Sequence, residues 1–126
     1  MGSPLQLPPL LRWLAWAGCG TAITIVLLIP ISPSISSEGP LGSSYSFTAN
    51  LVHIVAYGVW TALTALLPVA RRTRWLLSLL LLGHGAASEL LQGFVPTRYP
   101  DWEDVGWDLL GIVLGVAASW PWWRRE

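Results

Sequence analysis

The chain has 126 residues, of which 53% are hydrophobic and only 11% charged, and its seven basic and seven acidic side chains give a net charge of zero. A soluble domain usually carries about a quarter charged residues, so lipid is the expected solvent for the outer surface. The balanced charge argues against a nucleic-acid partner, the length allows one small domain over residues 1–126, and the single cysteine excludes an internal disulfide.

The first apolar run extends from Leu10 to Ile31, with Arg12 as its one charge. Serines and other small residues follow, as they do after the core of a secretory signal peptide. The run is longer than the roughly 7–15 residues of such a core. We therefore expect a retained helix over about residues 10–31.

Three further apolar runs predict helices over about residues 49–70, 75–94 and 104–120. Each run is close to the ~20 residues needed to cross a bilayer, and the last is the shortest. The predicted fold is all-α: a polytopic membrane protein with a bundle of four transmembrane helices. A soluble four-helix bundle is the alternative, but it would need a polar face on every helix, and the first run has none.

The arginines indicate an orientation. Six of the seven lie near the N-terminus, between the second and third runs, or near the C-terminus, whereas Arg98 lies between the third and fourth runs. Basic residues in short loops concentrate on the cytoplasmic side of a membrane. Both termini are therefore predicted to be cytoplasmic, and Arg98 is predicted to face outward. Most of the tryptophans fall near the predicted helix ends, as in interfacial aromatic belts.

Ionisable residues gather toward the outward end of three predicted helices. His53 lies near the start of the second helix, Glu89 near the end of the third, and Asp104 and Asp108 open the fourth. With a rise of 1.5 Å per residue, all four lie within roughly 10 Å of the outer interface. Charge inside a membrane helix is costly and usually functional, so these residues predict a polar site.

Spacings of three and four residues place polar and small residues on one face of each helix. The residues that share these faces are His53 with Tyr57, Glu89 with Gln92, and Asp104 with Asp108, Gly111 and Gly115. Small residues allow close helix approach, so the three faces are expected to turn toward one another. His84 lies deeper and off the Glu89 face, and we interpret it as a separate packed histidine.

The turn between the third and fourth helices has its own pattern. Pro96 ends the third helix, and Asp101 is a candidate N-cap for the fourth, whose dipole favours acidic residues in its first turn. Arg98 is the only basic residue on this side. Its planar guanidinium suits a bidentate bond to Glu89 or Asp104, or contact with a lipid phosphate.

The polar residues form one pattern across these helices: His53-x3-Tyr57, then Glu89-x2-Gln92, then Pro96-x-Arg98-x2-Asp101-x2-Asp104-x3-Asp108-x2-Gly111-x3-Gly115. The pattern resembles the VanZ-like family of small bacterial membrane proteins over about the second to fourth helices. The position of Asp108 is usually Asn in that family and that of Asn50 is often Lys, so the charge of the site differs. The resemblance implies a multi-pass protein of the bacterial cytoplasmic (inner) membrane. The family's founding member is associated with low-level teicoplanin resistance, so a glycopeptide-resistance factor is one alternative function.

Three further functions are open. In the first, an outward polar pocket binds a lipid or envelope headgroup, or the protein is an accessory subunit of a larger membrane complex. The expected pocket residues are His53, Tyr57, Glu89, Gln92, Arg98, Asp104 and Asp108. In the second, an intramembrane enzyme uses His53 as a general base or metal ligand, and Glu89 and Asp108 shuttle protons. In the third, the network only fixes the register of the helices.

Neither a metal site nor a cofactor is assigned from the sequence. One histidine with up to three carboxylates is chemically adequate for a divalent ion, but the two histidines lack the four-residue spacing of paired ligands, and no nucleophile motif is present. The expected partners are membrane lipid and, for an accessory subunit, other membrane proteins, with no nucleic acid.

Overall fold

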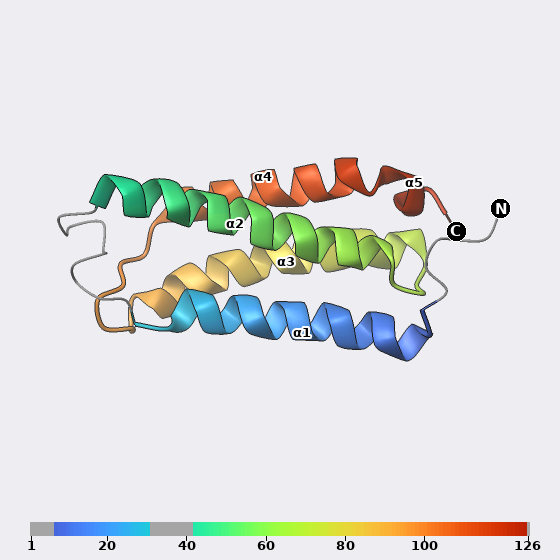
Figure 1. Cartoon of the computed structure of the whole chain (residues 1–126), viewed down its shortest axis with the longest axis horizontal. Helices are drawn as coiled ribbons and strands as arrows, with labels where there is room; N and C mark the ends of the chain where they lie inside the picture. The colour runs from blue at the N-terminus through green and yellow to red at the C-terminus, as the bar shows by residue number, and fades with distance from the viewer. Residues whose placement is uncertain (1–6, 31–41, 126) are drawn as a thin grey trace.

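The computed structural model describes residues 7–30 and 42–125, with side chains from Ser46 onward in the second segment. Within these residues there are five helices and no strand: α1 (Pro9–Leu28), α2 (Gly42–Ala65), α3 (Arg71–Gln92), α4 (Trp102–Ala118) and the single turn α5 (Trp120–Trp123). The four long helices lie alongside one another in an elongated bundle, and the start of α1 and the end of α4 lie at the same end (Figure 1). The all-α prediction is confirmed for the described residues.

The bounds of the second and third helices differ most from the predicted ones. The second helix begins at Gly42 rather than near residue 49, and it ends at Ala65 rather than at residue 70. Its end precedes Pro68, which disfavours helical backbone at the residue before it. The third helix begins at Arg71, so the arginines expected in the connecting turn lie in its first turn. The first helix ends at Leu28, with Ile29 as its C-cap, rather than near residue 31.

The closest pair of long helices is α2 and α4. A Cβ atom built on Gly111 would lie 2.5 Å from the carbonyl oxygen of Ile54, and one built on Gly115 would lie 2.5 Å from the carbonyl oxygen of Gly58. Both distances are too short for a side chain, so the backbones touch because glycine stands at these positions. This close approach brings the start of α4 against the first half of α2.

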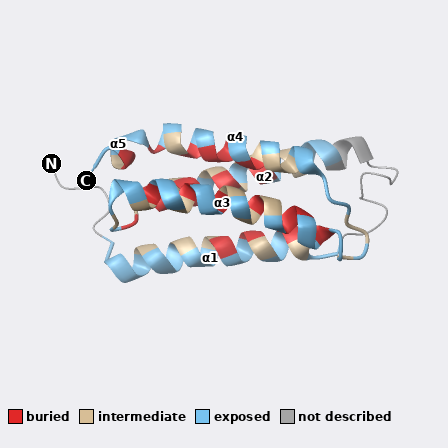
Figure 2. Ribbon diagram, turned by 180° about the vertical axis from the view of Figure 1, so that it is seen from behind, coloured by how far each residue is buried: buried red, intermediate tan, exposed pale blue. Residues whose placement is uncertain are grey.

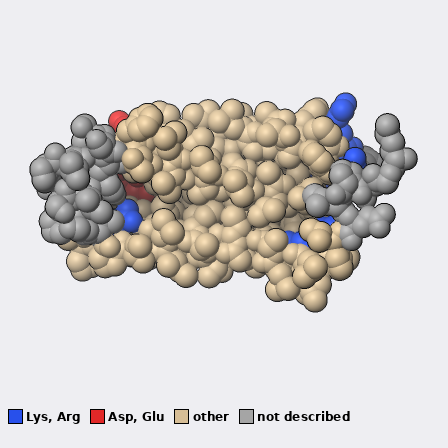
Figure 3. All heavy atoms as spheres, in the orientation of Figure 1, with Lys and Arg blue, Asp and Glu red and all other residues tan. Residues whose placement is uncertain are grey.

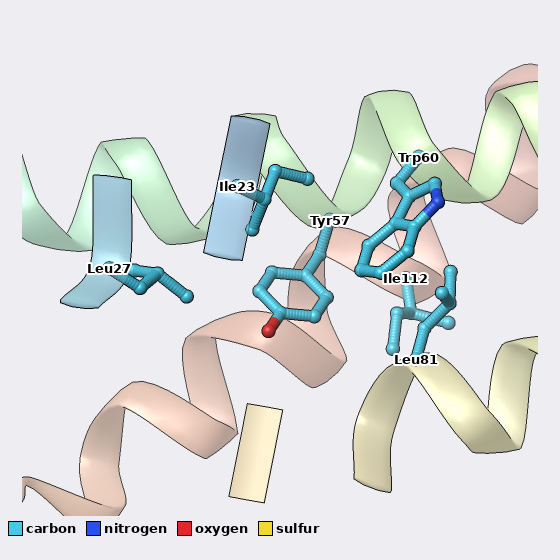
Figure 4. Close-up of a cluster of buried hydrophobic side chains, with 6 residues drawn as sticks. All are labelled: Ile23, Leu27, Tyr57, Trp60, Leu81 and Ile112. Atoms are coloured by element: carbon cyan, nitrogen blue, oxygen red, sulfur yellow. The ribbon is translucent and has the colours of Figure 1, made fainter. Parts of the chain in front are cut away.

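The hydrophobic core is small and draws on all four long helices. Figure 4 shows its six buried side chains, which are Ile23, Leu27, Tyr57, Trp60, Leu81 and Ile112. Trp60 is only 6% exposed and packs its ring edge-on against that of His84, at a centroid distance of 5.1 Å. Gly20 of α1 gives the Trp60 ring its space.

Each long helix turns a narrow buried stripe inward and leaves a wide exposed surface outward (Figure 2). Large apolar side chains are exposed on all four, for example Ile25 at 57%, Val55 at 60%, Leu79 at 66% and Val113 at 55%. Among the described residues, at least as many polar or charged side chains as apolar ones are buried. A bundle that folds in water shows the reverse arrangement.

By length and composition, α1 is the one described helix that could cross a membrane, and it lies near the N-terminus, where a signal sequence would meet the same criteria. Two of the other long helices, α3 and α4, fall short for identifiable reasons. α4 has only 17 residues, and α3 carries buried polar residues, among them Ser88, Glu89 and Gln92, that lower its hydropathy. Length and composition therefore identify one candidate span. An assignment of four spans also depends on the arrangement of exposed and buried residues.

At the end of the bundle that holds the start of α1, α5 folds back against the other helices. Trp123 is 1% exposed, and its ring lies against that of Trp75 at a centroid distance of 4.7 Å. The buried Arg74 donates hydrogen bonds to the carbonyl oxygens of Trp122, at 2.9 Å, and Arg125, at 2.8 Å. These contacts tie the C-terminal residues to the start of α3.

Candidate functional site

The opposite end of the bundle holds most of the acidic side chains. There the first half of α2, the end of α3 and the start of α4 come together (Figure 1). Figure 3 shows acidic side chains at this end with a basic group beside them, whereas the other end carries basic side chains. The glycine-mediated contact of α2 with α4 sets the distance at which their polar residues meet.

His53 lies between two carboxylates of α4. Its Nδ1–H donates to Asp108 Oδ1 at 2.6 Å, and its Nε2 lies 3.4 Å from Asp104 Oδ2. His53 is 4% exposed, Asp108 is completely buried, and Asp104 is half-buried. Because Asp104 and Asp108 are four residues apart on one helix, they present their carboxylates to the same neighbour.

Glu89 brings a third carboxylate from α3. It is completely buried, and its Oε2 accepts a hydrogen bond from the backbone N–H of Asp101 at 2.7 Å. Its Oε1 has no hydrogen-bond partner among the described residues. One potential ligand atom each from His53, Glu89 and Asp104 lie within 4.8 Å of one another. We call His53, Glu89, Asp104 and Asp108 the polar cluster.

A second chain of hydrogen bonds runs deeper into the bundle, from Tyr57 through His84 to α1. The hydroxyl group of Thr24 donates to the carbonyl oxygen of Gly20, so it accepts from Nε2–H of His84 at 2.8 Å. His84 Nδ1 is then the acceptor for the Tyr57 hydroxyl group, also at 2.8 Å. His84 is therefore joined to a predicted site residue, which its position off the Glu89 face had not indicated.

The structure gives Arg98 a different role from the expected bidentate bond. Its guanidinium donates to the carbonyl oxygens of Val26, at 3.0 Å, and Ile29, at 3.1 Å. These carbonyls belong to the C-terminal end of α1, which has no basic residue in its last turn and needs donors from elsewhere. Arg98 still interacts electrostatically with Asp104, but no bidentate pair with Glu89 or Asp104 is present in the described part of the chain.

Two other sequence expectations concern α3 and α4. Asp101 is the N-cap of α4, as predicted, and its Oδ1 accepts from the backbone N–H of Glu103 at 2.9 Å. Gln92 is 2% exposed on the same face of α3 as Glu89, and its amide nitrogen has no hydrogen-bond partner among the described residues. Gln92 is thus inside the bundle but is not hydrogen-bonded to the polar cluster.

Chemically, the polar cluster is a buried imidazole held among three carboxyl groups, which favours cations over anions. An apolar groove of about 410 Å³ lies nearby, between α3 and α4. Its lining includes Leu109, the residue after Asp108, and extends to Trp75 and Val116 toward the other end of the bundle.

Comparisons of the chain with protein-family models, with curated proteins and with solved structures return no match. The resemblance to the VanZ-like family therefore stays a prediction from the sequence.

Proposed function

We propose that this protein crosses the bacterial inner membrane four times, with both termini in the cytoplasm and the polar cluster in the outer leaflet. The surface supports this proposal, because exposed apolar side chains cover all four long helices while polar side chains point inward. In water such a surface would associate. The arginines of the α3 start and of the C-terminus lie at the end assigned to the cytoplasm.

Labelling of single cysteines in a Cys19→Ser background tests this orientation. Tyr99 and Arg124 are exposed at opposite ends of the bundle. A membrane-impermeant maleimide should label Tyr99→Cys in intact spheroplasts, and it should label Arg124→Cys only after permeabilisation. Labelling of Arg124→Cys alone in intact spheroplasts would contradict the proposed orientation.

The function that the geometry supports best is binding of the headgroup of a lipid or a lipid-linked envelope precursor at the polar cluster. The observation that supports this proposal is that several buried polar atoms at this end of the bundle have no hydrogen-bond partner among the described residues. A purely structural network stabilises packing only when each member is satisfied, yet Glu89 Oε1, Asp108 Oδ2 and Gln92 Nε2 are buried without partners among the described residues. A buried polar group without a hydrogen-bond partner costs about 1–3 kcal/mol of stability. The three such groups at this end of the bundle therefore favour a bound ligand.

The groove between α3 and α4 supports a lipid as that ligand. A headgroup at the polar cluster would place an acyl chain beside Leu109, where the groove begins. The groove lining is almost entirely apolar, with Ser78 as its one polar residue. Headgroup and chain would thus each meet matching chemistry along one face of the protein.

Native mass spectrometry of the purified protein, after a detergent wash that removes bulk lipid, tests binding. A retained phospholipid or lipid-linked adduct is expected for the wild-type chain and should be lost in Asp104→Asn. The matched control is Glu103→Gln, since Glu103 is exposed on the same turn of α4 and lies outside the polar cluster. A wild-type protein without any retained lipid, or equal retention in both variants, would refute the binding function.

A second candidate function is catalysis, which one observation favours. The 2.6 Å hydrogen bond from His53 to Asp108 holds the imidazole in one orientation, as a general base requires. An enzyme would convert the bound lipid rather than retain it. Mass spectra of defined nanodisc lipids, recorded before and after incubation with the wild-type chain and with His53→Ala, separate the two functions. A new lipid product formed only by the wild-type chain would identify an enzyme.

A further inference from the structure

We propose that the polar cluster binds one divalent transition-metal ion, of which Zn²⁺ is the representative. His53 Nε2, a Glu89 carboxylate oxygen and an Asp104 carboxylate oxygen would be its ligands, and Asp108 would orient His53. The inference shares its residues with the proposed headgroup site and deepens that proposal, because the ion would add a positive charge that attracts a phosphate to a cluster of carboxylates.

The separations of the three groups fit a single ion. Two atoms bound about 2.1 Å from one Zn²⁺ at the tetrahedral angle lie about 3.4 Å apart, and the distance from His53 Nε2 to Asp104 Oδ2 is 3.4 Å. The Glu89 oxygen completes a group whose atoms all lie within 4.8 Å of one another.

Asp108 prepares the histidine for coordination. By accepting the Nδ1–H of His53 at 2.6 Å, it fixes the tautomer in which the lone pair lies on Nε2. A buried carboxylate behind a ligating histidine is a common second partner in metal sites. In this tautomer, Nε2 and the Asp104 oxygen are both acceptors, and an ion between them accounts for their approach to 3.4 Å.

The buried Glu89 carboxylate is an independent indication of a ligand. It is completely buried, and Oε1 lacks a hydrogen-bond partner among the described residues although a carboxylate oxygen of Glu89 lies within 4.8 Å of ligand atoms of His53 and Asp104. Buried polar groups without partners are rare in folded proteins, and a bound ion or water often occupies the space beside such a group. An ion accounts for Glu89, for the geometry at His53 and for the surplus of acidic groups together.

The donor set also indicates the class of ion. One imidazole nitrogen with two carboxylate oxygens suits Zn²⁺ and neighbouring first-row ions better than Mg²⁺ or Ca²⁺, which take oxygen ligands alone. The two ligating carboxylates cancel the charge of the ion, which lowers the cost of placing it in a poorly solvated interior. Three protein ligands leave one tetrahedral position open for water or for a phosphate oxygen of a headgroup.

Metal analysis tests the inference. The full chain, purified without a polyhistidine tag and stripped with a chelator, is incubated with Zn²⁺ alone, desalted and analysed by plasma mass spectrometry. One Zn²⁺ per chain is expected for the wild type, and loss of the ion is expected in His53→Ala and Asp104→Asn. His84→Gln and Glu103→Gln are the matched controls and should keep the ion. Asp108→Asn keeps a hydrogen-bond acceptor but loses charge, and its affinity should fall about 10- to 100-fold.

A measurement on the wild-type chain guards against variants that fail to fold. Co²⁺ bound in a tetrahedral nitrogen/oxygen site gives visible absorption bands, and Zn²⁺ should displace it and remove them. No Zn²⁺ above background and no Co²⁺ bands in the folded wild type would overturn the inference, as would ion retention by folded His53→Ala. The cluster would then be a protonated imidazole between carboxylates.

The failure of the metal site can be told apart from the failure of the proposed function. Lipid retention by the wild type that is unchanged after chelation, with no bound Zn²⁺, would refute the metal and leave headgroup binding intact. Stoichiometric Zn²⁺ without lipid retention would refute headgroup binding and leave the metal site intact. If the metal site and headgroup binding are both correct, chelation should release a phosphate-bearing lipid such as phosphatidylglycerol from the protein in nanodiscs. Added Zn²⁺ should then restore lipid binding.

Discussion

Replacing Gly111 by alanine tests whether the close contact of α2 and α4 builds the polar cluster. The new Cβ would lie 2.5 Å from the carbonyl oxygen of Ile54, with two further backbone atoms of Ile54 at 3.1 Å. Backbone cannot rotate away as a side chain can, so α4 must move outward by several tenths of an ångström. Overpacking of this kind costs about 1–3 kcal/mol.

The chain offers a matched control on the same helix. A Cβ on Gly106 would meet nothing within 4 Å, so Gly106→Ala adds a methyl group to an open face. It should be neutral or stabilise the helix by up to about 1 kcal/mol, because alanine is the better helix former. Gly58→Ala should fall between the two, since its Cβ would lie 3.3 Å from the carbonyl oxygen of Gly111.

Equilibrium unfolding in mixed detergent micelles, followed by tryptophan fluorescence, measures these differences in the free energy of unfolding. Zn²⁺ binding measured on the same preparations reports on the polar cluster, since an outward shift of α4 would lengthen the bond from His53 to Asp108. Gly111→Ala should lose both stability and ion affinity, and Gly106→Ala should lose neither. Equal stability and affinity of the two variants would refute the close α2–α4 packing on which the polar cluster depends.

Three further substitutions test other features. Arg74→Ala removes the donor for three carbonyl groups, those of Leu67, Trp122 and Arg125, and should lower the free energy of unfolding by about 1–3 kcal/mol; unchanged stability would show that water replaces the arginine. Arg98→Ala frees the last carbonyls of α1 and should cost about 1 kcal/mol, measured by the same unfolding assay, without changing Zn²⁺ stoichiometry; loss of the ion would instead place Arg98 in the site. Leu79→Trp fills the groove between α3 and α4 and should reduce lipid retention in native mass spectra while leaving Zn²⁺ bound; full retention would exclude the groove as the acyl-chain site.

Features that depend on one helix at a time could be predicted from the sequence. The apolar runs predicted the helices, and the three- and four-residue spacing predicted the face on which Asp108 and Gly111 lie. The cap at Asp101 could also be predicted, because capping depends on a few neighbouring residues. The inward direction of the polar faces followed from the glycines, since only small residues let two backbones touch.

Features that depend on how helices are rotated and staggered against one another could not be predicted from the sequence. Arg98 reaches the end of α1 because α1 ends at the same height as the turn after α3, which no spacing within the sequence reveals. The hydrogen bond between Tyr57 and His84 requires a particular rotation of α3 against α2. The grouping of His53, Glu89 and Asp104 has the same origin, because it joins single atoms from three helices.

The bonds from Arg74 to the last turn of the chain have a consequence for assembly during synthesis. The guanidinium is nearly enclosed, and two of its acceptors lie 48 and 51 residues later in the sequence. Until those residues have been synthesised, Arg74 lacks two of its three carbonyl partners and keeps only that of Leu67. The packing of α5 and the residues after it against the start of α3 therefore has to follow the synthesis of all four long helices.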